Sequence, residues 1–412
     1  MTTSQFKKSK LIENNSQSLE ILKEKNFNDV PLDVAIEIFM RLPVKSVARF
    51  LLLSKFWAEI IRSRHFITSF QVRSSLQPRL LVVFIDLNKQ WNCEDWYFFS
   101  LSSSTTSYLS RVTCPFPDYV HYSHYVNGLI SRGYGLEKFI TNPSTGKSTV
   151  LGRVQTNSKV AQCFLGYDPV NDEYKLLVLC MKEKMQRHDG RTRILQLSSQ
   201  HQVFPLGVKK KPWRMIDYTT PHGPVLNSVC IDGVLYYVAF TDEDLSQLSL
   251  MRFDLGSEKL DLFTSLPADF PAAFLHGFTL MRYKGKVALA TKTLFNGIEV
   301  WVLDQQAEIH GWLKKSFSIK GVRRWLFCDL FITGTTHTGE FILAPRFYSN
   351  SFYVIYYNPD TKSLRKTKVE VNGGYDFSLR KTKVEVHGGY DFKHRETKAM
   401  VFPDYVETVR LL

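Results

Sequence analysis

The feature that most constrains the fold of this chain is a long succession of short strand-like runs, which begins near Arg79. The predicted strands are Leu80–Ile85, Tyr97–Leu101, Lys175–Leu179, Val234–Phe240, Val287–Thr291, Glu299–Leu303, Glu340–Leu343 and Phe352–Tyr357. Between them lie the turn dipeptides Asn127-Gly128, Asp189-Gly190, Asp232-Gly233 and Asn296-Gly297, which favour tight hairpins. Many short strands joined by regular turns predict a β-barrel, a sandwich or a propeller.

A loosely repeated turn favours the propeller among these three folds. Its four variants are Asn142-Pro143-Ser144-Thr145-Gly146-Lys147, Asp168-Pro169-Val170-Asn171-Asp172, Asp254-Leu255-Gly256-Ser257-Glu258-Lys259 and Asn358-Pro359-Asp360-Thr361-Lys362. The second and third copies start 86 residues apart, which is close to two blades of ~40–50 residues each. We therefore expect residues 80–412 to form one large all-β domain, a β-propeller.

The N-terminal part of the chain has a different pattern. Residues 1–26 are polar and charged, and we expect them to be disordered. Pro31 and Pro43 mark the ends of a predicted helix with a wide apolar face. The segment from Val47 to Ile61 is apolar nearly all round, which predicts a buried helix. Because so small a module cannot bury this much apolar surface alone, we expect another protein or the rest of the chain to cover it.

The helical segment resembles the plant F-box module over residues 27–72. The matching residues are Val30-Pro31, Ile36-Glu37-Ile38, Arg41-Leu42-Pro43, Lys45-Ser46-Val47, Arg49-Phe50 and Ser54-Lys55-x-Trp57. F-box modules bind the Skp-type adaptor of cullin-based ubiquitin ligases. The resemblance implies a small all-α module whose adaptor-facing residues include Pro31, Ile38, Leu42, Pro43 and Val47. The alternative is that these apolar side chains pack on the large domain.

The β region resembles the plant F-box-associated domain, a kelch-like β module. The matching pieces are Asn127-Gly128-Leu129-Ile130, Asn142-Pro143, Leu165-Gly166-Tyr167-Asp168-Pro169, Trp213-Arg214-Met215-Ile216, Cys230-Ile231-Asp232-Gly233-Val234-Leu235-Tyr236-Tyr237 and Phe402-Pro403-Asp404-Tyr405-Val406-Glu407. The order of these pieces is more informative than any one of them. In such proteins the β domain holds the target.

A tandem duplication is particular to this chain. Residues 363–377 and 378–392 are identical except at Asn372 and His387. Each copy contains an alternating pattern typical of a half-buried strand. Because a closed sheet has no place for an additional strand, we expect one copy to loop out.

Charge and cysteine usage limit the partners and the compartment. Half of the net charge of +14 lies between Lys182 and Arg214. Solvated strand faces and loops are the simpler interpretation, because a nucleic-acid surface would interleave aromatic residues for stacking, and only Trp213 lies close to the lysine run 209–211. The six cysteines form no CxxC pair, and no apolar run approaches the length of a membrane helix. We expect a cytoplasmic or nuclear protein that uses no metal or cofactor.

Three partial motifs could suggest chemistry, but none is complete. Residues 145–148 read Thr-Gly-Lys-Ser, yet position 141 is threonine where a phosphate-binding loop needs glycine. Ser144 and Lys147 have the spacing of a serine acyl-enzyme without its other elements. His121 and His124 could ligate a metal but lack a third ligand at a suitable spacing. We therefore expect no catalytic residues.

These features and the resemblance together predict a non-catalytic subunit of a Skp/cullin/F-box ubiquitin ligase. The helical module would bind the Skp-type adaptor, and through it a cullin, while the β domain would bind an unidentified protein target. Such a subunit works by raising the target's effective concentration near the ubiquitin-loaded enzyme. The alternatives are an adaptor-binding protein without a role in degradation and a basic propeller associated with nucleic acid, whose binding would depend on salt.

Overall fold

The computed structural model describes residues 31–410, except for 89–92, 104, 116–122, 189–190, 208–212, 219, 226–227, 243–246, 268, 271–276, 294–296, 305–310, 320–328, 349–351 and 372–396. The N-terminal residues 1–26, for which disorder is expected, lie outside this range. The chain divides into two compact units, Met1–Phe70 and Gln71–Leu412. Helices make up the described part of the first unit, and strands make up most of the second.

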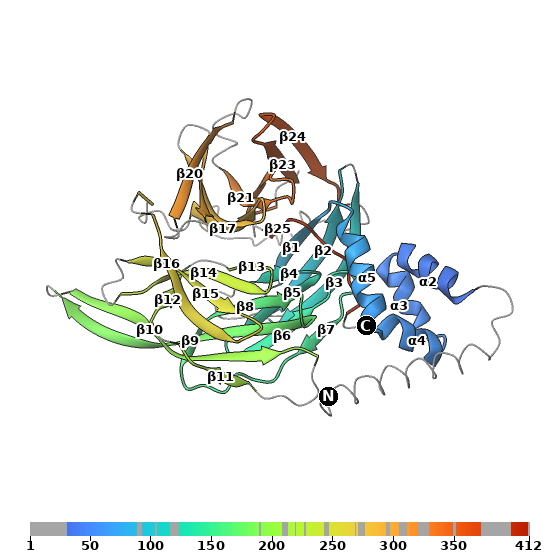
Figure 1. Ribbon diagram of the computed structural model, residues 1–412, viewed down its shortest axis with the longest axis horizontal. Coiled ribbons are helices and arrows are strands. Elements are labelled where there is room, and N and C mark those ends of the chain that lie inside the picture. Colours follow the sequence, from blue (N-terminus) through green and yellow to red (C-terminus); the bar gives the residue numbers. More distant parts are fainter. Residues whose placement is uncertain are drawn as a thin grey trace, which may run out of the picture. The chain divides into compact units, whose positions relative to one another are not determined.

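The helices are α2 (Leu32–Arg41), α3 (Val44–Phe50), α4 (Lys55–Arg62) and α5 (Arg64–Ser75), which are drawn in blue in Figure 1. The predicted helix between Pro31 and Pro43 is confirmed as α2. Pro31 takes the position before its first residue, and Leu42, which precedes Pro43, is extended and ends the helix. A residue before proline avoids the helical conformation, because the proline ring would clash with its backbone.

The single buried helix expected from Val47 to Ile61 is wrong. The chain forms two helices there, α3 and α4, with a turn over residues 51–53. Ser54 starts α4 because its hydroxyl accepts a hydrogen bond, 3.2 Å long, from the backbone N–H of Trp57. The apolar pattern continues from α3 into α4, so the serine at position 54 is the local sequence signal for the start of a second helix.

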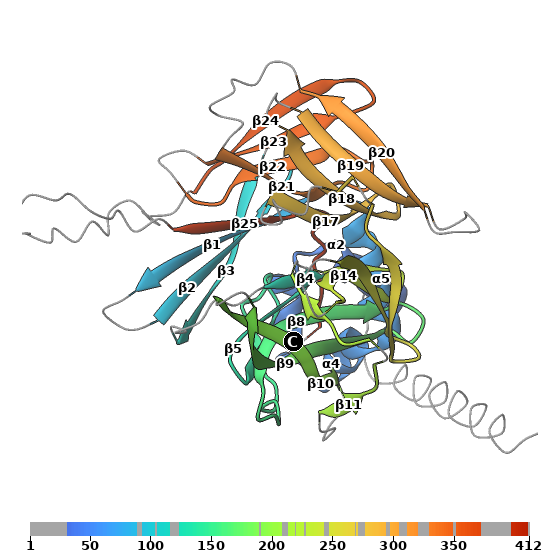
Figure 2. The same cartoon turned by 90° about the vertical axis from the view of Figure 1, so that its left-hand side faces the viewer.

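The described strands form six sheets, as expected for a β-propeller (Figures 1 and 2). Blade 1 contains β25 (Lys398–Phe402), β1 (Leu80–Asn88), β2 (Cys93–Leu101) and β3 (Thr106–Pro115). Blade 2 contains β4 (His124–Val126), β5 (Leu129–Tyr134), β6 (Glu137–Thr141) and β7 (Ser148–Val150). Blade 3 contains β8 (Lys159–Asp168), β9 (Glu173–His188), β10 (Arg191–Pro205) and β11 (Arg214–Ile216). Blade 4 contains β12 (Gly223–Pro224), β13 (Val229–Ile231), β14 (Val234–Phe240), β15 (Leu248–Asp254) and β16 (Lys259–Ser265). Blade 5 contains β17 (Phe278–Tyr283), β18 (Lys286–Thr293), β19 (Gly297–Asp304) and β20 (Gly311–Ser318). Blade 6 contains β21 (Leu330–Thr335), β22 (Phe341–Pro345), β23 (Phe352–Asn358) and β24 (Ser363–Val369).

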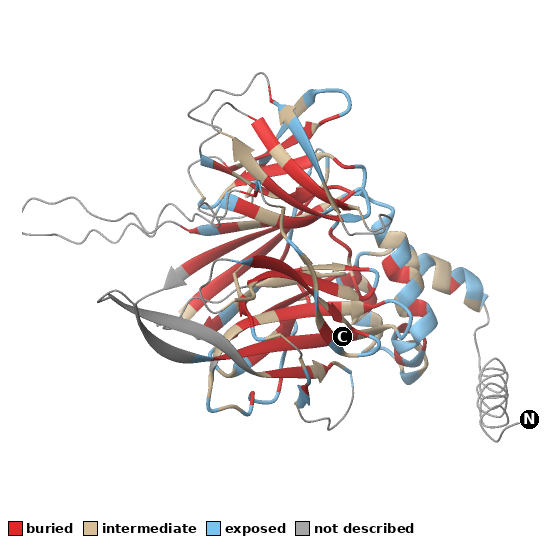
Figure 3. Cartoon of the chain, turned by 60° about the vertical axis from the view of Figure 1, so that its left-hand side comes forward, coloured by how far each residue is buried: buried red, intermediate tan, exposed pale blue. Residues whose placement is uncertain are grey.

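The propeller is closed by its C-terminal strand. β25 pairs antiparallel with β1, from Leu81 opposite Phe402 to Ile85 opposite Lys398, and thus becomes the first strand of blade 1. The first strands of neighbouring blades contact one another: β4 contacts β8, β17 contacts β21, and β21 contacts β25. Large apolar clusters fill the space between adjacent blades; one joins Phe84 of β1 to Phe352 of β23, with ring centroids 5.1 Å apart. Figure 3 shows these strands as mostly buried.

The repeated turn is present, but its use as a measure of blade length was wrong. In each copy the first side chain caps the turn, as Asp168 does by accepting a 2.9 Å hydrogen bond from Val170 N–H. However, the turn at Asp168 joins the first two strands of blade 3, whereas the turn at Asp254 joins the last two strands of blade 4. The 86-residue spacing therefore does not separate equivalent positions.

The first copy of the duplication contributes the outer strand of blade 6. β24 is the segment Ser363–Val369 and pairs with β23 over its whole length, from Asn358 opposite Ser363 to Phe352 opposite Val369. The second copy, 378–392, lies outside the described residues, so the expectation that one copy loops out stays a prediction.

We expect deletion of either copy to leave the melting temperature within about 2 °C of the parent chain, because surface insertions add little loop-closure entropy. The two deletions give chains that differ at one residue, Asn372 or His387, so each retains the sequence of β24. Thermal unfolding followed by circular dichroism measures this. A loss of several degrees in both chains would show that the fold uses both copies.

Candidate functional site

The apolar face of α2 is only partly covered. Ala35 and Phe39 are buried, whereas Val34 and Ile38 are 45% and 48% exposed. Leu42 is half-buried, one turn after Ile38, so Val34, Ile38 and Leu42 form a stripe along the helix at a spacing of four residues. A salt bridge of 2.9 Å between Arg41 and Glu37 borders this stripe. The helix thus presents a row of apolar side chains to solvent.

The other predicted adaptor-facing residues fall into two groups. Pro31 and Pro43 are exposed at the two ends of α2. Val47 of α3, in contrast, is fully buried. The structure thus brings four of the five predicted residues to the surface of one helix and its ends, and places the fifth in the interior.

An aromatic cluster fixes the helices that carry the stripe. The ring of Phe39 on α2 lies 4.4 Å from that of Phe50 on α3 and 4.7 Å from that of Trp57 on α4, measured between centroids. Aromatic pairs at these separations are favourable beyond the area that they bury. The buried side of α2 is therefore held by α3 and α4, which leaves the stripe outward.

Two exposed leucines were missed as site candidates. Leu52 is 89% exposed and Leu53 is 69% exposed, on the turn between α3 and α4. The sequence suggested that both were buried, because they were taken as part of one helix. Because exposed apolar patches mark protein-binding surfaces, the two adjacent leucines Leu52 and Leu53 join the candidate docking residues.

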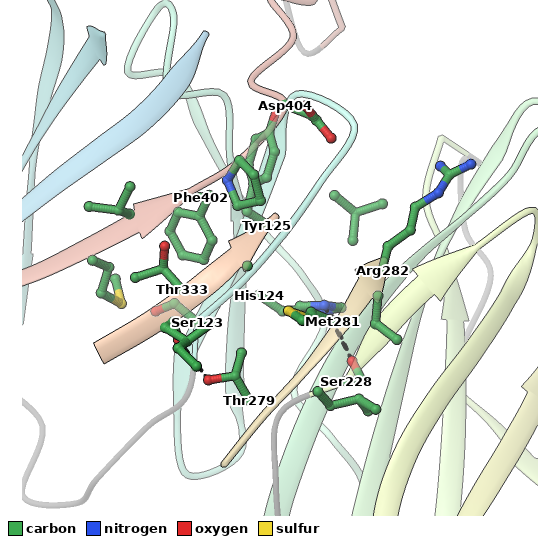
Figure 4. Close-up of a pocket in the computed structure, with 18 of the residues that line it drawn as sticks. Ser123, His124, Tyr125, Ser228, Thr279, Met281, Arg282, Thr333, Phe402 and Asp404 are labelled. Atoms are coloured by element: carbon green, nitrogen blue, oxygen red, sulfur yellow. Dashed lines mark hydrogen bonds between the residues drawn. The ribbon is translucent and has the colours of Figure 1, made fainter. Parts of the chain in front are cut away.

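The second candidate site is a cavity of about 1200 Å³ at the centre of the propeller. Each blade contributes lining residues, which include Val401 of β25, Val126 of β4, Tyr167 of β8, Val229 of β13, Met281 of β17 and Ile332 of β21. Most of these side chains are apolar, and Ser123, Thr279 and Thr333 add hydroxyl groups (Figure 4). The volume is sufficient for a small molecule or for several side chains of another protein.

His124, one of the two weak metal candidates, lines this cavity. Its Nδ1 accepts a 3.1 Å hydrogen bond from Leu165 N–H, and its ring lies 3.3 Å from Ser228 Oγ, as the dashed line in Figure 4 shows. Burial lowers the pKa of His124 to about 4, so the imidazole is neutral at neutral pH. His121 lies outside the described residues. Within the described ranges no three His, Cys, Asp or Glu side chains are grouped as metal ligands would be.

The remaining partial motif has a structural explanation. Ser144 is fully buried, and its hydroxyl lies 2.5 Å from Tyr405 Oη. Lys147, three residues later, is exposed. The interpretation of this segment as an asparagine-capped turn is supported, because Asn142 Oδ1 accepts a 2.9 Å hydrogen bond from Ser144 N–H.

The C-terminal segment is tied to blades 1 and 2. Tyr405 is fully buried within the cluster that contains Trp96 and Ile130. Asn142 Nδ2 donates to the backbone oxygens of Thr408 and Arg410, at 2.7 and 2.9 Å. These contacts secure the chain directly after the strand that closes the propeller.

Blades 3 and 4 share a buried pair of histidines. His201 is fully buried, and neither ring nitrogen has a hydrogen-bond partner among the described residues. Its ring centroid lies 5.0 Å from that of His222, whose Nε2 is 2.7 Å from Tyr237 Oη. Burial, and to a smaller extent His222, lower the pKa of His201 from 6.5 to about 3.

We expect acid to destabilise the propeller through His201. The unfolded chain binds a proton near the ordinary histidine pKa, whereas the folded chain does so only near pH 3. Stability from this group is therefore complete above about pH 6.5 and falls by about 2 kcal/mol between about pH 7 and about pH 5. Urea unfolding measures this: between about pH 7 and about pH 5, the free energy of unfolding of His201→Phe should fall by about 2 kcal/mol less than that of the parent chain. An equal fall in both proteins would contradict the prediction.

Comparison with known proteins agrees with this geometry. Residues 27–69 match the model of the F-box domain, and residues 79–406 match that of the F-box associated beta propeller domain, whose description does not mention kelch repeats. A chain described as an F-box protein of Arabidopsis thaliana is 96% identical over 412 residues, which is the full length of both. A second relative from that plant is 48% identical over 367 residues, which is 88% of this chain and 81% of the relative. Among the described residues no helix is long and apolar enough to cross a membrane.

Proposed function

Because this chain belongs to the F-box proteins that carry an F-box associated beta propeller domain, we propose that it is a substrate-recognition subunit of a Skp/cullin/F-box ubiquitin ligase. The helical module binds the Skp-type adaptor and the propeller binds a protein target. The subunit does no bond chemistry itself and accelerates ubiquitin transfer by holding the target near the enzyme. We place this activity in the cytoplasm or the nucleus, where cullin complexes operate.

The observation that carries this proposal is the exposed stripe of α2. A helix with Val34 and Ile38 about half exposed leaves apolar surface that water hydrates unfavourably. Pro31 and Pro43, at the ends of the helix, are exposed as well. Covering it with a partner helix or groove supplies the free energy of association. We assign Val47 a supporting role, because its side chain is buried and holds α3 in place.

Complex formation with purified components tests the proposal. The full chain is mixed with a plant Skp-type adaptor and a cullin, and the mixture is separated by size exclusion with light scattering. We expect one equimolar complex of the three proteins. Elution of this chain apart from the adaptor would refute the assignment. A complex with adaptor that never includes cullin would instead support an interaction protein without a role in ubiquitin transfer.

A further inference from the structure

The central cavity of the propeller has apolar side chains in its wall that the fold leaves only half-buried. These are Val126 of β4, Val229 of β13, and Met400 and Phe402 of β25. Apolar surface in contact with water is hydrated unfavourably, so covering it favours the binding of an apolar molecule. The volume of about 1200 Å³ is sufficient for a ligand of the size of a typical drug.

The charged residues that line the cavity do not require an ionic ligand. The guanidinium of Arg346 lies 3.7 Å from the ring centroid of Phe331, and the ammonium of Lys292 lies 5.3 Å from the same centroid. Glu94 is 2% exposed and accepts a 3.1 Å hydrogen bond from Trp96 Nε1. The other charged lining residues are exposed to solvent and comprise two of each sign: Asp232, Arg282, Lys398 and Asp404. We therefore expect a neutral ligand.

Two threonine hydroxyls in the cavity wall are arranged as hydrogen-bond acceptors. Thr279 Oγ1 donates to the backbone oxygen of Ile332, at 2.6 Å, and Thr333 Oγ1 donates to that of Ile342, at 3.2 Å. A hydroxyl group has one hydrogen and two lone pairs, so each of these oxygens has its hydrogen in use and keeps lone pairs for a ligand. A ligand group that binds to them must therefore supply a hydrogen of its own.

A β-bulge sets the position of the Thr333 hydroxyl. Ile332 and Gly334 of β21 pair with consecutive residues of β22, so Thr333 is the extra residue between them. Gly334 has a φ of 152°, and a Cβ atom there would lie 2.9 Å from Pro403 Cγ, so glycine is required at this point. Bulges redirect a side chain and are frequent beside functional sites.

His124 and Ser228 supply the opposite hydrogen-bonding role. Because His124 is neutral and its Nδ1 accepts the N–H of Leu165, its Nε2 carries the ring hydrogen. Ser228 Oγ lies 3.3 Å from that nitrogen and accepts this hydrogen, which leaves the serine hydrogen for a ligand. Figure 4 shows His124, Ser228 and Thr279 in the wall of one cavity. An alcohol group suits both kinds of partner, because its oxygen accepts one hydrogen bond while its hydrogen donates another.

We propose that the central cavity binds a neutral, largely apolar small molecule that carries a hydroxyl group. Its apolar skeleton covers Val126, Val229 and Met400. Its hydroxyl donates to Thr279 or Thr333 and accepts from Ser228. This inference goes beyond the proposed function, because it concerns the propeller alone and holds whether or not the helical module binds an adaptor.

Titration of the full chain with 1-pyrenebutanol, a neutral fluorescent alcohol, tests the site. The ratio of the pyrene emission bands reports transfer of the probe from water to an apolar environment. Two matched probes are 1-butylpyrene, which lacks the hydroxyl group, and 1-pyrenebutyrate, which is an anion. We expect saturable binding of the alcohol, about tenfold tighter than that of either matched probe, because only the alcohol satisfies the polar groups of the wall without burying a charge.

Two substitutions of different kinds locate the bound probe. Val229→Trp fills the cavity and should weaken binding of the alcohol by about 50-fold or more, whereas Val150→Trp, on β7 at a position that is 65% exposed, should change it by less than about threefold. Thr279→Val with Thr333→Val removes the two acceptor oxygens. This pair should weaken binding of the alcohol about tenfold and that of 1-butylpyrene less than about twofold. Circular dichroism compares the fold of every variant with that of the parent chain.

Several outcomes would overturn the inference. Absence of saturable binding would show that the cavity holds no ligand of this class. Equal affinities for the alcohol and 1-butylpyrene, or no loss in the threonine pair, would exclude recognition of the hydroxyl group. Binding of 1-pyrenebutyrate as tight as that of the alcohol would exclude selection for a neutral ligand. Undiminished binding by a folded Val229→Trp chain would place the probe outside the cavity. Adaptor binding is measured separately and should be the same in all of these chains.

Discussion

Replacing Tyr405 with alanine is expected to lower the free energy of unfolding by about 3–5 kcal/mol, the largest stability loss that we predict. The side chain is fully buried, and it packs in the cluster with Trp96 and Ile130. Its hydroxyl bonds the buried Ser144, and its ring lies 5.6 Å from the guanidinium carbon of Arg79. Because Tyr405 follows β25, its loss also loosens the strand that closes the propeller.

Chemical denaturation of Tyr405→Ala and Tyr405→Phe separates packing from hydrogen bonding. Phenylalanine keeps the ring and removes only the bond to Ser144, so we expect a loss of about 1–2 kcal/mol. Asp404→Asn, at the neighbouring exposed position, serves as the control and should change stability by less than about 1 kcal/mol. A loss below about 1 kcal/mol for the alanine variant would show that the C-terminal segment does not secure closure.

Introducing aspartate at Ile38 is expected to weaken binding of the Skp-type adaptor by about 100-fold or more. Ile38 is the centre of the exposed stripe on α2, between Val34 and Leu42. A carboxylate there would be buried without a partner in the complex, which costs several kcal/mol. Because Ile38 is 48% exposed in the free chain, the same substitution should leave the fold intact. Isothermal titration with purified adaptor measures the effect.

Two further variants separate docking from folding in this module. Thr68→Asp places the same charge at an exposed position of α5 and should leave the dissociation constant within about threefold. Val47→Ala, at the fully buried position, should lower the melting temperature yet retain most of the affinity. Unchanged affinity of Ile38→Asp would exclude the stripe as the docking surface, and a larger loss for Val47→Ala than for Ile38→Asp would reverse the roles assigned here.

The sequence was sufficient to predict the middle strands of the blades but not the inner strands at the centre of the propeller. Strands such as β14 and β19 are long, apolar and bordered by glycine turns, so their pattern is local. The inner strands are harder, because β4 has only three residues and β12 only two, and their pairing depends on neighbouring strands. Closure through β25 depends on pairing residues more than 300 positions apart along the chain, from Leu81 to Phe402.

The two candidate sites also differ in how far the sequence could predict them. The exposed stripe of α2 could be predicted because Ile38 and Leu42 are one helical turn apart, so periodicity places them on one face. Val47 could not be separated from them, because burial depends on how α3 packs. The central cavity could not be predicted from the sequence, because residues from all six blades line it. Phe331, Lys292 and Lys398 come from three different blades, and only the closed propeller brings them together.

The most direct measurement of the central claim is a profile of ubiquitin attachment sites in plant cells with the proteasome blocked. Cells expressing the parent chain are compared with cells expressing Ile38→Asp, and proteins retained by each chain are identified in parallel. We expect a defined set of proteins to co-purify with both chains but to gain ubiquitin only with the parent chain, because proximity to the ligase requires the adaptor. Identical ubiquitin profiles for the two chains would contradict the assignment as a recognition subunit.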